Sequence, residues 1–235
     1  DNIDLDACTS RSITVIPATG ANDLSVAEYV ITTAAMLLRG AYTAQARMLA
    51  GEWPRNDLMG GELAGKTMGL VGLGAIARLV KKKALALGMQ VAAHDPYVPN
   101  GDPAWEGVKQ LPLDALFATA DVLSLHVPLT DGTRDLVNAG ALAKMKPTGI
   151  LINAARGGVV DEAALAQALR DGRLGGAALD VFAQEPLTAD AAQVFAAAPN
   201  LILTPHVAGV TQESNVRVSE LIARKVLEAL EAGQS

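Results

Sequence analysis

Three polar residues in the C-terminal half of the chain have the chemistry for carboxylate binding and proton transfer. Arg156 follows the aliphatic run GILINAA, and its planar guanidinium suits bidentate binding of a carboxylate. His206 follows LILTP and is the best candidate among the three histidines for a general acid–base group near neutral pH. Glu185, in DVFAQEP, is a candidate partner for it, because a neighbouring carboxylate raises the pKa of a histidine.

Each of these residues also has a plainer interpretation. Arg156 could cap a strand end by pairing with a local acid, and Glu185 could be an ordinary exposed loop acid. Asp180, at the end of GGAAL, has the same ambiguity. We interpret His94 as a bystander and His126, in SLHVP, as a loop residue beside a bound cofactor.

A glycine turn precedes these residues in the chain. VGLGAIA contains Gly72 and Gly74, an apolar run precedes it and a helical pattern follows, which is the context that a dinucleotide-binding turn requires. Gly72 permits the tight turn, Gly74 removes a Cβ from the path of a pyrophosphate, and the first helical amides face the phosphates. Ala77 replaces the third glycine of the fingerprint, which admits alanine there.

The position of an acidic residue further along the chain supports the interpretation of this turn. Asp95 ends MQVAAHD, 21 positions after Gly74, where a carboxylate binds the adenosine ribose hydroxyls. A carboxylate there repels a 2′-phosphate, so the predicted cofactor is NAD rather than NADP. We interpret Lys81, Lys82 and Lys83 as a solvated helix face rather than a phosphate site.

Alternating aliphatic runs and helical patterns must position these residues. The predicted strands are 67–72, 89–94, 121–127, 148–154, 175–181 and 200–205. The predicted helices between them are 75–87, 112–118, 139–144, 161–170 (with Asp161 as N-cap) and 189–196. Most of the strands are too continuously apolar to have one solvent-facing side. This alternation predicts an α/β fold with a doubly wound parallel sheet of the Rossmann type.

Further elements flank this pattern. Long amphipathic helices are predicted over 24–50, interrupted at most by Gly40, and over 211–232, and a short strand over 12–16. We divide the chain into 1–16, a remnant of a second domain, 17–208, the cofactor-binding domain with its hinge and long helix, and 209–235, a crossover helix.

Composition argues against several classes of function. The net charge is −6 without a basic stripe, which argues against a nucleic-acid partner. No apolar run approaches the ~20 residues that span a bilayer, so we expect no membrane partner. The single Cys8 rules out an internal disulfide and a cysteine metal cluster, and suits the cytoplasm. No motif for a bound metal or an acyl-transfer serine is present, and we expect no metal.

The phrases VGLGAIA, HDP, LHVPLT, NAARGGVVDE, AALDVFAQEP and LTPHVAG, in this order, closely resemble the NAD-dependent D-2-hydroxyacid dehydrogenases. The resemblance covers nearly the whole chain. It implies hydride transfer between NAD(H) and C2 of a small 2-hydroxy or 2-keto acid. Arg156 would bind the substrate carboxylate, His206 would move the proton, and Glu185 would pair with His206.

The resemblance also implies a set of cofactor-binding residues, among them Asp180, which is similar to an aspartate near the nicotinamide carboxamide. The full set is Gly72, Gly74, Ala75, Ile76, Asp95, His126, Val127, Pro128, Thr133, Ala154, Ala155, Arg156, Asp180, His206, Ala208 and Gly209. Ala75 departs from the basic residue of many relatives, so one phosphate contact is expected to be lost.

Relatives carry an N-terminal substrate-binding domain before the phrase NIDLDA, of which residues 1–16 resemble the last piece. We therefore expect the chain as written to bind NAD with little turnover. The helix 24–50 and the segment GGELAGK resemble dimer-forming elements, which implies a homodimer through the cofactor domain. The alternative is a non-catalytic, NAD-sensing binding protein of the corepressor type.

Overall fold

The computed structural model describes residues 3–232, and its centre is a seven-stranded sheet in the order β3-β2-β1-β4-β5-β6-β7. All neighbouring strands are parallel. The strands are β1 Thr67–Val71, β2 Gln90–His94, β3 Lys109–Gln110, β4 Val122–Leu125, β5 Ile150–Asn153, β6 Gly176–Leu179 and β7 Leu201–Leu203. The predicted doubly wound α/β fold is confirmed. Residues 1–2 and 233–235 of the predicted end segments lie outside the described residues.

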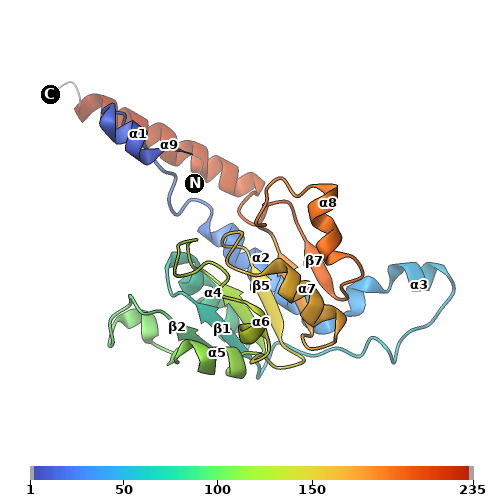
Figure 1. Ribbon diagram of the computed structural model, residues 1–235. Helices are drawn as coiled ribbons and strands as arrows, with labels where there is room; N and C mark the ends of the chain where they lie inside the picture. The colour runs from blue at the N-terminus through green and yellow to red at the C-terminus, as the bar shows by residue number, and fades with distance from the viewer. Residues whose placement is uncertain (1–2, 233–235) are drawn as a thin grey trace.

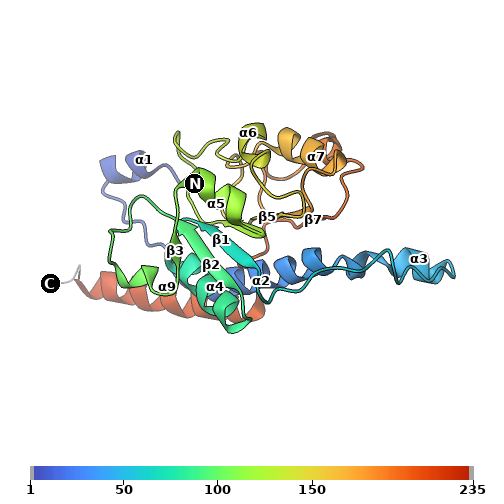
Figure 2. The same ribbon diagram turned by 90° about the horizontal axis from the view of Figure 1, so that it is seen from below.

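Helices cover both faces of the sheet. The face seen uppermost in Figure 2 carries α5 (Leu113–Thr119), α6 (Ala139–Leu142) and α7 (Glu162–Arg170), and the other carries α2 (Asp23–Arg39) and α4 (Ala75–Ala86). The remaining helices are α1 Leu5–Ser10, α3 Gln45–Leu49, α8 Ala189–Ala192 and α9 Gln212–Ala232, with 3₁₀ turns η1 Ala41–Thr43, η2 Pro103–Trp105 and η3 Gln193–Phe195.

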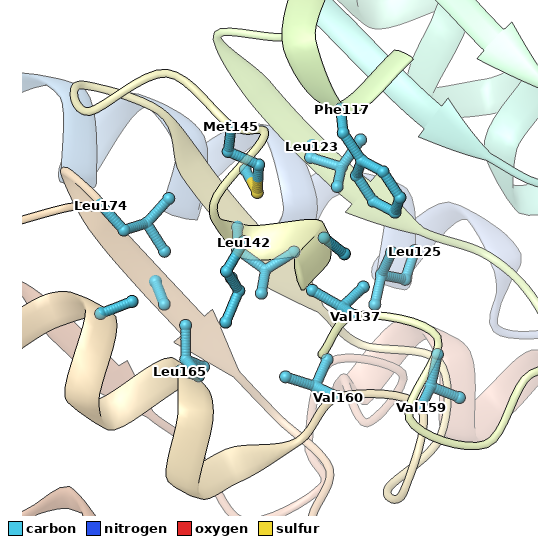
Figure 3. Packing of buried hydrophobic residues seen from close by; sticks show 14 of the residues in the cluster. Phe117, Leu123, Leu125, Val137, Leu142, Met145, Val159, Val160, Leu165 and Leu174 are labelled. Atoms are coloured by element: carbon cyan, nitrogen blue, oxygen red, sulfur yellow. The ribbon is translucent and has the colours of Figure 1, made fainter. Parts of the chain in front are cut away.

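Each face of the sheet has its own apolar core. Ile150 and Ile152 point toward α2 and α4, whereas Leu151 between them belongs to the cluster under α5, α6 and α7. Figure 3 shows that second cluster, in which Phe117 of α5 and Leu165 of α7 pack over the strands. Burial of each such side chain contributes about 1.5–3 kcal/mol, and this is why the strands are apolar on both faces.

Some predicted elements are wrong. Residues 13–18 have no regular structure, so the strand over 12–16 is absent, and a short helix, α1, precedes it instead. The segment is largely exposed and has no neighbouring strand to supply hydrogen bonds. The helix over 24–50 ends at Arg39. Gly40 there adopts a left-handed conformation with φ +61°, and its amide donates to the carbonyl oxygen of Met36. The two-residue strand β3 was not predicted.

Beyond Gly40 the chain leaves the body of the molecule. Figures 1 and 2 both show α3 on an arm that projects away from the sheet, on the side opposite to the end of α9. Arg47 in this arm pairs with Glu52 at 2.6 Å and with Asp57 at 2.8 Å. Within residues 3–232, no helix combines the length and the apolar character that a membrane span needs.

Candidate functional site

The topology creates a crevice between β1 and β4. From β1 the chain moves to β2 on one side of the sheet, and after β3 it returns to β4 on the other side. Open α/β sheets bind their ligands at the carboxyl ends of strands at such a switch point. Gly72 follows β1 and His126 follows β4, and a Cβ on Gly72 would overlap the carbonyl oxygen of His126. Gly72 has φ +91°, so both its conformation and its surroundings require glycine.

Gly74 is a glycine for a different reason. A Cβ there would meet no protein atom within 4 Å, and the φ of Gly74 is an ordinary −73°. The open space lies before the N-terminus of α4, which begins at Ala75 and has no side-chain cap hydrogen bond. A pyrophosphate would fill this space and accept from the first amides of the helix. Ala77, in place of the third glycine, is fully buried in the core beneath.

Two adjoining cavities flank this turn. One, of about 400 Å³, contains Asp95 in its wall, and the other, of about 280 Å³, contains Arg156. The predicted cofactor residues in the first are Gly72, Gly74, Asp95, His126, Val127, Pro128 and Thr133. Those in the second are Gly74, Ala75, Ile76, His126, Val127, Pro128, Ala154, Ala155 and Arg156. The two cavities share Gly74, His126, Val127 and Pro128, so they adjoin each other at the switch point.

Asp95 also holds the glycine turn itself. Its Oδ2 accepts from the amide of Leu73 at 2.7 Å, and its Oδ1 accepts from the amide of Tyr97 at 2.9 Å. Each carboxylate oxygen has a second lone pair that can accept from a ribose hydroxyl. The same side chain can therefore orient the turn and bind the sugar.

Arg156 is positioned by a residue that the sequence analysis missed. Asn153, at the end of β5, is 1% exposed and bonds to two adjacent residues of the loop that follows. Its Nδ2 donates to the carbonyl oxygen of Arg156 at 2.9 Å, and its Oδ1 accepts from the amide of Ala155 at 3.1 Å. The position of Asn153 at a buried strand end was the signal that could have found it.

Glu185 and His206 meet as predicted. Nδ1 of His206 lies 2.8 Å from Oε2 of Glu185, and both residues line a cavity of about 630 Å³. Burial raises the pKa of Glu185, but hydrogen bonds from His206 and the Phe182 amide, with the charges of His206 and Arg156, hold it below its ordinary value. An ionised carboxylate only accepts, so Nδ1 of His206 carries the hydrogen. Nε2 then remains for proton exchange with a ligand.

Asp180 lies beneath the histidine and is not among the residues that line the cavity of His206. It is 1% exposed, and its carboxylate accepts from the Thr204 hydroxyl and from the amides of Val207 and Ala208. These bonds shape the turn of His206, whose own φ is +57°. Predicted Ala208 is buried here, and predicted Gly209 packs so closely on Asn22 that a Cβ would overlap its side chain.

Further residues of the site were not predicted. Tyr29 of α2 lies with its hydroxyl 2.7 Å from Thr204, which extends the hydrogen bonds under His206 to a helix far away in sequence. Thr19 and Asp23 contribute to the cavity that contains Arg156. Tyr29, Thr19 and Asp23 have no strand-end position that would mark them in the sequence.

The other two histidines have different surroundings. Burial lowers the pKa of His126 to about 4, and its Nε2 lies 3.0 Å from the hydroxyl of Ser124. A histidine with this pKa is neutral at physiological pH, so it cannot serve there as a proton donor. Nδ1 of His94 lies 3.0 Å from the carbonyl oxygen of Leu111.

Comparisons with known proteins agree with this geometry. Residues 31–208 match the family described as D-isomer specific 2-hydroxyacid dehydrogenase, NAD binding domain. The chain is 58% identical to (S)-sulfolactate dehydrogenase of Chromohalobacter salexigens, over 98% of this chain and 74% of that protein. It is 41% identical to D-3-phosphoglycerate dehydrogenase of Archaeoglobus fulgidus, over 97% of this chain and 43% of that protein, so it spans less than half of this relative.

A solved structure is also similar. D-lactate dehydrogenase from Aquifex aeolicus, complexed with NAD and lactic acid, superposes with a TM-score of 0.87 at 33% identity, covering 99% of this chain and 74% of that one. The predicted cofactor, NAD, is confirmed by the family match and by this NAD complex. The chain belongs to the D-isomer specific 2-hydroxyacid dehydrogenase family of NAD-dependent oxidoreductases and contains its NAD-binding domain.

Proposed function

We propose that the full-length protein containing this chain transfers a hydride between NAD(H) and C2 of a small D-2-hydroxy acid or the corresponding 2-keto acid. The observation that carries the proposal is the 2.8 Å contact between Glu185 and His206. This pair lies at the carboxyl ends of the strands, the same edge of the sheet at which the glycine turn and Arg156 lie. This edge combines a dinucleotide groove, a cation for a carboxylate and an acid–base pair. Few other reactions need all three together.

Each side chain has a distinct part in this reaction. Bound NAD(H) supplies or accepts the hydride, and the side chains handle charge and protons. Arg156 binds the substrate carboxylate and so fixes the orientation of C2. His206 donates a proton to the keto oxygen during reduction and removes it during oxidation. Glu185, whose pKa is held low, remains ionised and stabilises the imidazolium.

The names of the relatives indicate a narrower substrate class. Sulfolactate and phosphoglycerate, for which two of them are named, are three-carbon 2-hydroxy acids with a second anionic group. We propose that the substrate of this protein belongs to that class. The greater identity to the sulfolactate enzyme makes sulfolactate and sulfopyruvate the first pair to test.

The experiment is a turnover assay on the full-length protein. NADH oxidation is followed with sulfopyruvate, phosphohydroxypyruvate, hydroxypyruvate, glyoxylate and pyruvate, and we expect the largest kcat/KM for a substrate with two anionic groups. NADH binding without oxidation by any of the five would favour the NAD-sensing alternative and overturn the enzyme proposal.

We also propose that the protein is a cytoplasmic homodimer. The projecting arm exposes large apolar side chains that a partner would bury, namely Tyr42, Met48, Leu49, Trp53 and Met59. A second copy is the simplest partner for such a surface. Light scattering during size-exclusion chromatography measures the molar mass of the protein, and a monomer at micromolar concentration would contradict this proposal.

A further inference from the structure

Two adjacent backbone amides in the turn after β6 each donate to a carboxylate. The amide of Phe182 donates to Oε1 of Glu185 at 2.9 Å, and the amide of Ala183 donates to Oε1 of Glu162 at 2.6 Å. Glu162 is the first residue of α7 and comes 21 positions earlier in the chain. The turn that presents Glu185 to His206 is therefore attached to α7 through one charge-assisted hydrogen bond.

The same turn is fixed from a second side. A Cβ on Gly157 would overlap the carbonyl oxygen of Phe182, so the segment after Arg156 passes directly against the turn. The ring of Phe182 is 6% exposed and packs edge-on against Phe195, with 6.1 Å between the ring centroids. The Phe182 end of the turn is thus held by packing. Ala183, the next residue, is exposed, and its amide is held by Glu162.

Glu162 itself is half-buried, and its carboxylate accepts the hydrogen bond from the amide of Ala183. Burial raises the pKa of Glu162, the hydrogen bond from Ala183 lowers it, and the neighbouring charge of Asp161 raises it. Among the described residues, it does not belong to the walls of the cavities that contain His206, Arg156 or Asp95. A direct contact with substrate is therefore not its part in the site.

We propose that Glu162 is a positioning residue, which holds the Ala183 amide and thereby keeps the Phe182 amide on Glu185 and Glu185 on His206. The chain of contacts runs from the start of α7 through two successive amides to the acid–base pair, with no gap between partners. Its consequence for turnover rests on the proposed function, whereas its consequence for geometry does not.

Crystal structures of variants of this chain test the geometry without turnover. E162D keeps a charge in the first turn of α7 but withdraws the carboxylate by one methylene, and E162A removes it. We expect the distance from Glu185 to Nδ1 of His206 to exceed 3.5 Å in both. E162Q retains an oxygen that can accept from Ala183, and it should keep the 2.8 Å contact. An unchanged Glu185–His206 contact in E162A and E162D would overturn the proposal.

Kinetics of the full-length protein test the consequence. We expect E162A and E162D to lower kcat by roughly 10-fold, a part of what general acid–base catalysis contributes, with the Kd for NADH unchanged. E162Q should restore most of kcat. Glu213→Ala is the matched control, because Glu213 is an exposed acid in the first turn of α9.

The two proposals fail in different ways. If the wild-type protein oxidises NADH but E162A and E162D retain full kcat, Glu162 has no part in the reaction and only the present inference is lost. If the wild type shows no turnover, the proposed function is lost, and the crystal structures still decide whether Glu162 positions Glu185.

Discussion

The hydroxyl of Thr204 donates a 2.6 Å hydrogen bond to Oδ1 of Asp180, directly beneath the turn that carries His206. Asp180 is 1% exposed and also accepts from the amides of Val207 and Ala208, at 2.9 and 2.8 Å. A buried carboxylate is tolerated only when donors surround it, and the donors here come from the residues on either side of His206. The conformation of the acid–base residue thus depends on a carboxylate that does not line its cavity.

Replacing Thr204 by valine should therefore cost stability. T204V removes a donor from a buried carboxylate and the partner of the Tyr29 hydroxyl, so we expect the free energy of unfolding to fall by about 1–3 kcal/mol. Urea unfolding measures it. T204S keeps the hydroxyl and is the control. Equal stability of T204V and the wild type would show that the Asp180 carboxylate does not need this donor.

The two glycines of the turn should respond differently to substitution. G72A places a Cβ against the carbonyl of His126 in a left-handed conformation, so it should lower the free energy of unfolding by at least about 1 kcal/mol. The Cβ that G74V adds meets no protein atom within 4 Å, so this substitution should leave the free energy of unfolding nearly unchanged. It should instead weaken NADH binding by about 10-fold or more, because its side chain occupies the space of the pyrophosphate.

Urea unfolding and NADH fluorescence titration of both variants check this pair of effects. G74V bound to NADH as tightly as the wild type would show that the space before α4 does not receive the pyrophosphate. G72A with normal stability would contradict the close approach of Gly72 and His126.

The sequence alone predicts those elements and residues that a pattern in the neighbouring residues marks. Strands such as Ile150–Asn153 are aliphatic up to their last residue because both faces are covered. Arg156, Glu185 and His206 are recognisable because they follow such strands. The predicted strand over 12–16 is wrong because a run of β-branched residues forms a strand only where a neighbouring strand supplies hydrogen bonds and packing. Tyr29 and Thr204 were missed because their contact joins positions 175 residues apart, which no local pattern records.

Acid should weaken the fold through Asp121, at the opposite end of the sheet from the site. Oδ1 of Asp121 accepts from Nζ of Lys146 at 2.7 Å, and Oδ2 accepts from the amide of Thr67 at 2.8 Å. Burial raises the pKa of Asp121, but these bonds outweigh it and the pKa lies below its ordinary value of 3.8. The lowered pKa contributes stability above pH 3.8, and this contribution is lost as the pH falls through the folded-state value.

D121N should accordingly destabilise the protein at pH 7 and by a smaller amount at pH 3, because the wild type has then begun to lose the same contribution. Urea unfolding at the two pH values measures both differences. Asp114→Asn is the control, since Asp114 is an exposed acid that also pairs with a lysine, Lys144. If D121N lowers the free energy of unfolding by as much at pH 3 as at pH 7, the charge of Asp121 is not the cause of the destabilisation.

The acid–base pair gives the sharpest test of the reaction. H206A removes the proton donor, so kcat of the full-length protein should fall by about 10²–10⁴-fold. NADH affinity should stay within about twofold, since the cavity with His206 is separate from the groove around Gly74.

E185Q keeps a hydrogen-bond acceptor for Nδ1 of His206 but removes the charge that stabilises the imidazolium, so its kcat should lie between those of H206A and the wild type. Stopped-flow measurement of NADH binding and steady-state turnover separate the two effects, and an H206A protein with unchanged kcat would remove His206 from the mechanism.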